Sequence, residues 1–580
     1  MMDIETEKVR SFRLTADLAF DARTVQRIMQ DNLTISFNGL GYDLPLIQAA
    51  IEGMSNDAIK NISDKIIKSK NPWTVIRNAD LRVPNWNHID IMNVAPGQAG
   101  LKLYGGRLNA HTLQDLPFEP DMILSQEQMT DLETYCINDL RLTKLLYESL
   151  SGQIALREQM GQQYNMDLRS KGDAQIAEAV LKHELEANGV TVNRPNVKPG
   201  TTFKYTAPGW ISFYDSELMS LLIDSIETVF KVQPSGSVAI PASLGRKIPY
   251  DGAQYTVGIG GLHSGETGVT VKPGTDDVLF DVDFASYYPS IILGEGYYPK
   301  HLGEKFLSIY KDIVTRRLKA KAERDMVTAD SLKICVNSSF GKFGNKYSSL
   351  YSPDLLISVT LTGQLALLML IERITRAGGK AISANTDGVV VLCPKAKLEE
   401  VRQAMFEFEL TSGFTLEETH YKSIHIESVN NYIAVKTDGK IKGKGSFAPG
   451  GLMKNPTFPI CSEAVRVWAS KGIHPEQTID ECKDVSKFLA VRTVTGGGSW
   501  AGDHLGKVVR WYVSNNGLAQ PILYAKNGNR VPKTDMAVPM MTLTDDLPSD
   551  LDKQYYLAEA MKMIQRTGVT WTRKQLNGSL

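Results

Sequence analysis

The stretch that most constrains the fold of this chain is residues 278–292, VLFDVDFASYYPSII. Side chains alternate along a strand, so Asp281 and Asp283 should share one face. Pro289 cannot donate to a central ladder, and the strand should therefore stop near Ser286. We expect a carboxylate at a strand end, followed by free backbone N–H groups that suit a cation and phosphate oxygens. By itself the stretch leaves open a plain buried strand with a chance aspartate.

Length and composition place this stretch in a multidomain globular protein. A chain of 580 residues is too long for a single core. It has no run of about 18 apolar residues and no apolar N-terminal segment, so neither a membrane span nor a secretory signal is expected. Its five cysteines form no C-x-x-C pair, which argues against zinc and disulfides and favours a reducing, cytoplasmic compartment.

Charge is unevenly distributed along the chain, although the net charge is only −1. Residues 1–150 hold 15 Lys/Arg and 20 Asp/Glu, whereas residues 301–346 hold 10 and 5. Residues 446–580 are also basic, with 16 against 12. Basic segments around acidic sites suit a polyphosphate substrate with metal ions. Ordinary solvated surface is the alternative that charge alone leaves open.

The N-terminal part brings carboxylates from three separate elements. Asp3 and Glu5 would share one face of a strand, and Asp43 opens a helix. Tyr135 and Asp139 are four residues apart in a long helical pattern. Four clustered carboxylates repel one another unless divalent cations neutralise them, and such clusters carry out two-metal phosphodiester hydrolysis.

Two helical patterns follow the opening stretch and are rich in Lys and Arg. Arg317 and Lys321 share a face of the first, and Lys333 and Asn337 share a face of the second. An antiparallel pair would present these groups along one side, which suits a triphosphate. A solvated basic face would explain the first helix equally well, but not Lys333, which has apolar neighbours in sequence.

These segments resemble the motifs of family B DNA polymerases. Residues 283–292 resemble motif A, D-x-x-S-L-Y-P-S-I-I, with Tyr287 in the usual Leu place. Residues 333–341 resemble motif B, K-x-x-x-N-S-x-Y-G, with Phe340 for the common Tyr. The spacing between Asp283 and Lys333 is 50 positions, which leaves little room for the insertions of protein-primed members.

Motif C is represented with substitutions. The predicted hairpin 381–392 is similar to Y-x-D-T-D-S, with Asp387 kept as the second aspartate. Ser383, Asn385 and Gly388 replace the Tyr, the first Asp and the Ser. Asp387-Gly388 is also a strong tight-turn signal.

Three further segments match the family loosely. Gln364 stands where a T-x-x-G-R motif has Arg, so that phosphate contact is doubtful. Asn430-Asn431-Tyr432 falls where the family has K-x-Y at the primer end, and only Tyr432 matches. Nearby lysines are candidates for the missing charge: Lys436, Lys440, Lys442 and Lys444. Gly260 and Gly261 resemble the Gly-rich loop that handles template, although a plain hairpin turn explains them as well.

The N-terminal motifs resemble the three exonuclease motifs of the proofreading domain of DNA polymerases. They are Asp3-Ile-Glu5, Asn38-x-x-x-Tyr42-Asp43 and Tyr135-x-x-x-Asp139. Only two residues precede Asp3, so the first strand would be short.

The resemblance implies specific roles. The implied catalytic residues are Asp283, Asp387, Asp3, Glu5, Asp43, Asp139 and Tyr135. The implied metal ligands are the six carboxylates of that set together with the Phe284 backbone. The implied nucleotide-binding residues are Ser286, Tyr287, Tyr288, Arg317, Lys321, Lys333 and Asn337. The implied DNA-binding residues are Gly260, Gly261 and Tyr432. Tyr288 would exclude a ribose 2′-hydroxyl.

The resemblance also implies an α/β multidomain fold with a ribonuclease-H-like exonuclease domain and a right-hand palm, fingers and thumb. The implied divisions are exonuclease 1–150, linker and first part of the palm 151–295, fingers 296–345, palm 346–445 and thumb 446–580. Two Mg²⁺ ions are expected at each catalytic site, with Mn²⁺ able to substitute. We expect a monomer that binds DNA primer–template and dNTPs, needs no terminal protein, and works with phage replication proteins in a host cytoplasm.

Two other functions stay open at this point. One is an exonuclease whose polymerase half has decayed, which the changes at Gln364, Asn385 and Asn430 motivate. The other is a non-catalytic subunit that binds primer–template. The order of at least five motifs favours a polymerase over both.

Overall fold

The computed structural model describes residues 1–15 and 17–570. Its chain divides into two compact units, each of which is described by itself. Unit 1 comprises Met1–Gly172, Gly450–Pro459 and Lys483–Asp552. Unit 2 comprises Asp173–Pro449, Ile460–Cys482 and the chain from Lys553. The predicted thumb, 446–580, is therefore shared between the two units, and its assignment as one domain stays a prediction.

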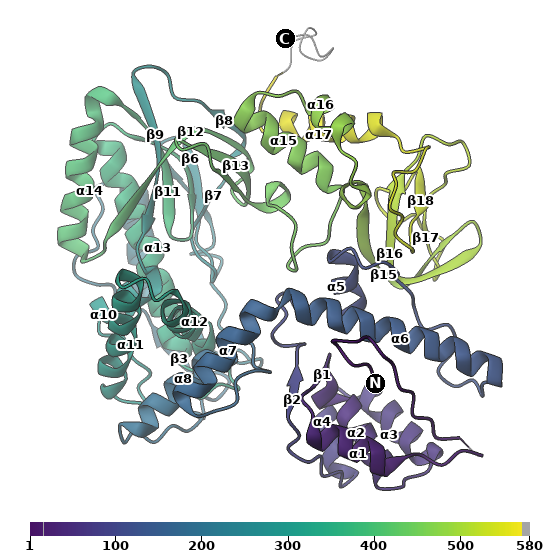
Figure 1. The fold of residues 1–580 in the computed structure, drawn as a ribbon. Coiled ribbons are helices and arrows are strands. Elements are labelled where there is room, and N and C mark those ends of the chain that lie inside the picture. The colour runs from purple at the N-terminus through teal and green to yellow at the C-terminus, as the bar shows by residue number, and fades with distance from the viewer. Residues whose placement is uncertain (16, 571–580) are drawn as a thin grey trace. The chain divides into compact units, whose positions relative to one another are not determined.

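Unit 1 combines a helical N-terminal part with a C-terminal sheet (Figure 1). Its helices are α1 (Ala22–Asp31), α2 (Asp43–Ile51), α3 (Asn56–Lys68), α4 (Pro72–Asn78), α5 (Leu101–Arg107), α6 (Gln126–Ser149) and α7 (Ser151–Tyr164). Its strands are β1 (Thr34–Ser36), β2 (His88–Asp90), β15 (Ala490–Trp500), β16 (Asp503–Val513), β17 (Leu523–Tyr524) and β18 (Ala537–Pro539).

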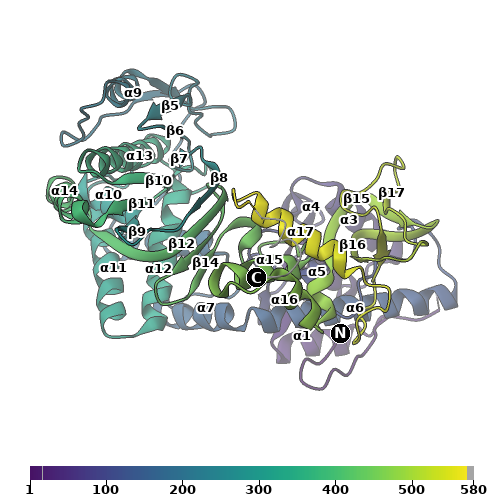
Figure 2. The same cartoon turned by 90° about the horizontal axis from the view of Figure 1, so that it is seen from above.

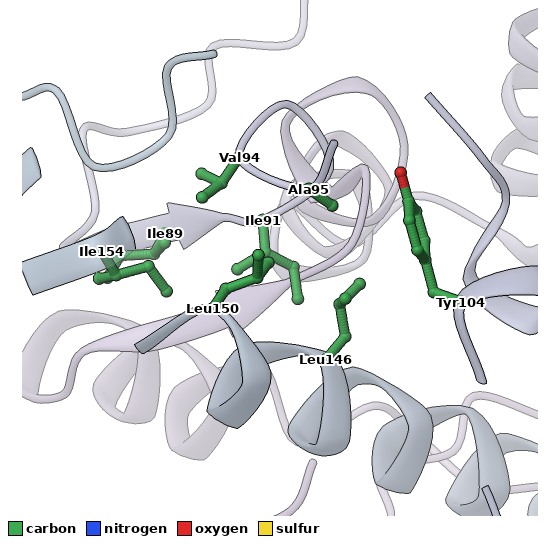
Figure 3. Packing of buried hydrophobic residues seen from close by; sticks show 8 residues of the cluster. All are labelled: Ile89, Ile91, Val94, Ala95, Tyr104, Leu146, Leu150 and Ile154. Carbon is green, nitrogen blue, oxygen red and sulfur yellow. The ribbon is translucent and has the colours of Figure 1, made fainter. Parts of the chain in front are cut away.

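The N-terminal core of unit 1 forms where α6 meets the parallel pair β1–β2. Figure 3 shows Ile91 close to Leu146 of α6 and to Leu150, which follows this helix, and it shows Ile89 beside Ile154 of α7. Ser125 begins α6 with a capping box to Gln128, which satisfies the first free N–H groups of the helix. This packing fixes the helix that carries Tyr135 and Asp139.

The C-terminal part of unit 1 is a four-stranded antiparallel sheet, in the order β17-β15-β16-β18. The sequence predicts helical runs that alternate with turns over 446–580, with TGGGSWAGD as one turn. Helices do form at Pro459–Lys471, Pro475–Glu481 and Lys553–Gln565, and Ala501–Gly502 is a turn within that segment. The sheet between these helices was not predicted, and β15 continues through the glycines before the turn. Arg510 is fully buried and donates to the Ala110 and Met540 carbonyls at 2.6 and 2.7 Å, which joins this sheet to the N-terminal part.

Unit 2 is built on a ten-stranded sheet with helices around it. Its helices are α8 (Asp173–Ala187), α9 (Ser216–Glu227), α10 (Tyr287–Gly294), α11 (Lys305–Ala322), α12 (Met326–Phe343), α13 (Pro353–Arg376), α14 (Leu398–Ser412), α15 (Pro459–Lys471), α16 (Pro475–Glu481) and α17 (Lys553–Gln565). Its strands are β3 (Thr202–Lys204), β4 (Val229–Lys231), β5 (Lys247–Tyr250), β6 (Ala253–Thr256), β7 (His263–Ser264), β8 (Thr267–Val271), β9 (Asp277–Phe284), β10 (Lys380–Asn385), β11 (Gly388–Pro394), β12 (Leu416–Ser428), β13 (Asn431–Lys436) and β14 (Ile441–Gly443).

The sheet runs in the order β14-β13-β12-β9-β11-β10-β7-β6-β5, with β8 paired to β12. The opening stretch of the sequence supplies β9, which lies at the centre between β12 and β11. A central strand has its whole ladder satisfied, which explains the apolar run before Asp283. Strands β11 and β12 therefore pair with the end of β9, at Asp283, on both sides.

Helix α13 is the core helix of unit 2 and lies alongside β10 and β11 (Figure 2). By length and composition alone it could cross a membrane, but 83% of its most apolar window is buried inside the unit. Core helices of folded domains have the same apolar character. Helices α11 and α12 pack against each other and against α8.

Candidate active site

The centre of the sheet brings Asp283 and Asp387 together. Asp283 is the next-to-last residue of β9 and lies opposite Gly388, the first residue of β11. The N–H of Phe284 donates to the Asp387 carbonyl at 2.8 Å, which ties the end of β9 to the hairpin between β10 and β11. Two carboxylates 104 positions apart in sequence thus sit on adjacent strand ends.

The electrostatics of this pair suit a bound cation. Burial, and then the nearby Asp281 carboxylate, raise the pKa of Asp283 to about 6. Burial also raises the pKa of Asp387. Desolvation and like charge both penalise two ionised carboxylates. Mg²⁺ is commonly held by one or two carboxylates with water and substrate phosphates completing its shell. The pair fits that ion, although no group of three His, Cys, Asp or Glu residues forms a metal cluster within 1–15 and 17–570.

Gly388 has a different role from the one its sequence predicts. The Asp387-Gly388 pair predicts a tight turn. The turn forms one position earlier, at Thr386 and Asp387, where Thr386 has φ 58°, and Gly388 is already the first residue of β11. A Cβ on Gly388 would overlap the Asp283 Oδ1 atom and lie 3.1 Å from the Val282 carbonyl. Gly388 is therefore required for the close approach of the Asp283 carboxylate.

The turn after β9 is less open to a ligand than expected. The N–H groups of Phe284 and Ala285 are already bonded, the latter to the Thr415 carbonyl at 2.8 Å. Ser286 has φ 51° and begins α10, and the first turn of a helix leaves its N–H groups without intrahelical partners. The row of free amides predicted from the sequence therefore reduces to the start of α10.

The two tyrosines of this turn have different environments. Tyr287 is 6% exposed, and its hydroxyl occupies the space beside Gly363, so its side chain belongs to the core. Tyr288 is half-buried and stacks flat on Phe340, with ring centroids 3.9 Å apart. Burial, and the neighbouring Asp387 carboxylate, raise the pKa of Tyr288. Of the two rings, that of Tyr288 remains accessible at the site.

The predicted phosphate-binding residues lie on α11 and α12, as their spacing indicated. Arg317 is half-buried and donates to the Ser286 hydroxyl at 3.3 Å. Lys321, Lys333 and Asn337 are exposed. Helical geometry puts Lys333 on the solvent side despite its apolar sequence neighbours, so its side chain is exposed rather than buried.

Gln364 does not replace the family's arginine in any phosphate contact. Its side chain is fully buried and binds both backbone groups of Gly258, accepting from the N–H at 2.9 Å and donating to the carbonyl at 2.8 Å. That bond holds the glycine-rich loop. Gly261 in turn lies against Thr386, where a Cβ would meet the Thr386 Cα at 3.1 Å. Gly261 thereby supports the Asp387 hairpin, and the DNA-binding role of Gly260 and Gly261 stays a prediction.

Asn385 and Asn430 are joined by a side-chain hydrogen bond of 3.1 Å. The two positions at which the chain lacks the expected charges are thus adjacent in space. Sequence reasoning treated them as separate losses, since they are 45 positions apart.

Sequence reasoning did not assign a role to Asp281. Its carboxylate is 5% exposed, and its Oδ2 atom accepts from the Tyr421 hydroxyl at 2.7 Å and from Lys442 Nζ at 2.9 Å. Lys442 Nζ also lies 3.9 Å from Asp283 Oδ2. The D-x-D pattern with a shared strand face was the available signal. Its lysine partner comes from a strand 161 residues away.

A second carboxylate group occurs in unit 1. Burial raises the pKa of Asp43, the first residue of α2, to about 6, and the Asp90 and Asp139 carboxylates add to the shift. Burial also raises the pKa of Asp139, whose Oδ1 atom has no hydrogen-bond partner among residues 1–15 and 17–570. Asp90 was not predicted, and its carboxylate is used by the Asn38 and Leu40 N–H groups at 2.9 and 3.1 Å.

Tyr135 lies beside this second group. Its hydroxyl accepts from Lys102 Nζ at 2.7 Å, and Lys102 also donates to Asp115 at 2.9 Å. Burial raises the pKa of Tyr135 well above its usual value, and the Asp139 carboxylate adds to this. Tyr135 and Asp139 therefore act on each other, as their i,i+4 spacing predicted.

The expected strand at Asp3 and Glu5 is not formed. Residues 4–6 make a turn, in which Asp3 Oδ1 accepts from the N–H and hydroxyl of Thr6 at 2.7 and 2.8 Å. The strand prediction is wrong because the Asp3 side chain stabilises a local turn on Thr6, which competes with an extended strand. Asp3 and Glu5 are exposed, and neither is among the carboxylates that raise the pKa of Asp43.

No family model matches the chain. DNA polymerase 2 of Aeropyrum pernix is 23% identical over 242 residues, 34% of this chain and 30% of that protein. DNA polymerase 1 of Sulfurisphaera ohwakuensis is 27% identical over 216 residues, 30% of this chain and 24% of that protein.

The matched segments span less than a third of each of these relatives. Among solved structures, the family B DNA polymerase from the hyperthermophilic archaeon Pyrobaculum calidifontis aligns at 13% identity with a TM-score of 0.41, over 95% of this chain and 72% of that one. The sequence matches carry the conclusion that part of this chain is related to archaeal DNA polymerases.

Proposed function

We propose that the chain is a template-directed DNA polymerase of the family B type that extends a primer 3′ end with dNTPs. The observation that carries the proposal is the register of β9 with β11, which sets Asp283 beside the Asp387 hairpin. Its relationship to archaeal DNA polymerases supports the same reaction.

The chemistry of this site follows from the groups around the carboxylates. Asp283 and Asp387, with the backbone at Phe284, would hold Mg²⁺, which supplies activation of the primer hydroxyl and neutralisation of the triphosphate when bound. Arg317 and Lys333 would bind the triphosphate oxygens through their positive charges. Tyr288, held flat on Phe340, would meet the sugar and exclude a 2′-hydroxyl. Template pairing would select the base, with protein contacts mainly to the backbone.

A primer-extension assay with Mg²⁺, run with and without dNTPs, tests this function. The wild-type chain should add nucleotides in template order, and Asp387→Ala should abolish extension while sparing primer degradation. Extension by Asp387→Ala would refute the assignment of motif C. Degradation without extension by the wild type would favour the decayed polymerase. Neither activity, with tight DNA binding, would favour the non-catalytic subunit.

We propose 3′–5′ exonuclease activity as a second function, in unit 1. It is supported by the electrostatic coupling of Asp43 with Asp139 and by the buried, unpartnered Oδ1 atom of Asp139. An unpartnered buried carboxylate oxygen is what a missing cation would leave. Asp139→Ala should abolish degradation of single-stranded DNA and spare extension. Loss of both activities would contradict two separate sites.

We also propose that the protein replicates a phage genome in the host cytoplasm, as a monomer and from an ordinary nucleic-acid primer. The short interval between Asp283 and Lys333 supports the primer assignment. Extension of a DNA primer without added protein would test it.

A further inference from the structure

A lysine is tethered beside the catalytic carboxylates by two residues that the mechanism above does not use. Asp281, Tyr421 and Lys442 come from β9, β12 and β14. The Tyr421 hydroxyl and Lys442 Nζ both donate to Asp281 Oδ2, at 2.7 and 2.9 Å. Asp281 is buried, and the Lys442 side chain is 39% exposed. The ammonium is therefore fixed at its buried side and open at the other.

If its role were only structural, burying the Asp281 carboxylate with Lys442 would cost folding free energy without a clear gain. A buried carboxylate needs a partner, and replacing a buried ion pair by apolar residues is often neutral or stabilising. Asp281 also adds a second negative charge two positions from Asp283, on the same face of β9. What the contact with Asp281 does achieve is to place the Lys442 ammonium 3.9 Å from Asp283 Oδ2.

Lys442 lies on the side of the site where the primer end is expected. It lies opposite Ala434 of β13, two residues from Tyr432, the residue that matches the tyrosine of the K-x-Y motif. Burial raises the pKa of Tyr432, and the nearby Lys442 charge opposes that rise. The lysine of that motif is replaced here by Asn430, which is neutral and bonds to Asn385 at 3.1 Å. The structure therefore offers a cation beside Tyr432 that comes from another strand.

The neighbouring lysines are placed differently. Lys440 is 80% exposed and pairs with Asp438 at 3.3 Å. Lys444 is near Asp387, but its ammonium has no carboxylate partner within 4.0 Å among the described residues. Of the lysines between 436 and 444, Lys442 is the one whose ammonium donates to the buried Asp281 and lies within 4.0 Å of Asp283.

We infer that Lys442 is a positioning residue that binds the last phosphodiester of the primer, in place of the lysine absent at Asn430. Asp281, which also accepts from Tyr421, fixes the position of the Lys442 ammonium. The inference rests on the proposed polymerase function, since it assumes that a primer 3′ end lies at Asp283. It names the side chain that would fix that end.

Lys442→Met tests the inference because it keeps the length of the side chain and removes the charge. Fluorescence anisotropy with a labelled primer–template in EDTA measures binding without metal or turnover. We expect about five- to tenfold weaker binding, and a salt dependence of the affinity whose slope falls by about 0.9, the value for one phosphate contact. Lys422→Met, an exposed lysine next to Tyr421 on β12, is the matched control for loss of one positive charge.

Two double variants separate positioning from a structural role. Asp281→Asn with Lys442→Met removes both charges, so it should fold even if Lys442→Met does not, and it should keep the reduced salt slope. Asn430→Lys with Lys442→Met returns a cation near Tyr432 and should recover most of the affinity. Circular dichroism and thermal unfolding check that each variant is folded.

Three results would overturn the inference. The first is an unchanged salt slope in Lys442→Met. The second is wild-type affinity in the Asp281→Asn/Lys442→Met protein, which would make Lys442 only a counter-ion. The third is a wild-type chain that binds no primer–template. A wild type that binds primer–template but adds no nucleotide would instead defeat the proposed polymerase function, and the binding comparison would still decide the role of Lys442.

Discussion

Substitution of Gly388 by alanine should impair catalysis through a single steric contact. Gly388 has no positive φ, so alanine is allowed by its backbone, and the effect comes from the added methyl group alone. That Cβ would overlap Asp283 Oδ1 and lie 3.2 Å from the Asp283 Cγ atom. To restore an ordinary van der Waals contact, the carboxylate has to retreat by about 1 Å.

The magnitude follows from this displacement. Overpacking of a buried strand costs about 1–3 kcal/mol in free energy of unfolding. Misplacing a catalytic group by about 1 Å costs roughly 10²-fold in rate, or about 2.7 kcal/mol in the activation barrier. We therefore expect the extension kcat of Gly388→Ala to fall about 100-fold, with a modest loss of thermal stability.

Single-turnover primer extension at saturating dNTP and Mg²⁺ measures this rate, and thermal unfolding measures the stability. Gly294→Ala, at the end of α10, is the control, because a Cβ there meets nothing within 4 Å. A Gly388→Ala protein that extends primers within about twofold of the wild-type rate would refute the reasoning, because Asp283 would then tolerate the methyl group.

Three further predictions concern other parts of the molecule. Burial raises the pKa of Asp43 from 3.8 to about 6, so its ionised form destabilises the metal-free native state above about pH 6. Asp43→Asn should therefore raise the Tm by a few degrees at pH 7 without divalent cations and have no effect near pH 4, and a lowered Tm at pH 7 would contradict this sign. Gln364→Leu should lower the free energy of unfolding by about 1–3 kcal/mol or more, because the Gly258 N–H and carbonyl lose their partner. Urea denaturation measures this loss, and a change below about 0.5 kcal/mol would count against both hydrogen bonds. Tyr288→Val should lower the preference for dNTPs over rNTPs by about tenfold or more in competitive incorporation, and unchanged discrimination would remove Tyr288 from the sugar site.

The carboxylate pair illustrates what can be predicted from local sequence. The apolar run before Asp283 predicted a strand that ends at the turn, and the structure has β9 ending at Phe284. The helical patterns around Arg317 and Lys333 also appear as α11 and α12. These predictions succeed because strand alternation and helical periodicity are properties of neighbouring residues.

Predictions failed where a contact from a distant segment or a local cap competed with the pattern. Asp3 caps a turn on Thr6 instead of extending a strand. The sequence made a phosphate contact at Gln364 doubtful but did not reveal that its buried side chain binds the Gly258 backbone. The glycine run of β15 lies in a strand that β16 pairs on either side of a register shift, with Gly498 opposite Gly506, and no local signal predicts that partner.

The sequence by itself determined which residue types are available at the site: the carboxylates of Asp283 and Asp387, the basic helices, and the absence of charge at Asn385 and Asn430. Only the tertiary structure decided how they are used. It set Gly388 against Asp283, and it brought Lys442 to Asp281 across 161 residues. The physical reason is that side-chain type and periodicity are encoded locally, whereas strand register and close packing depend on segments that meet only when the chain is folded.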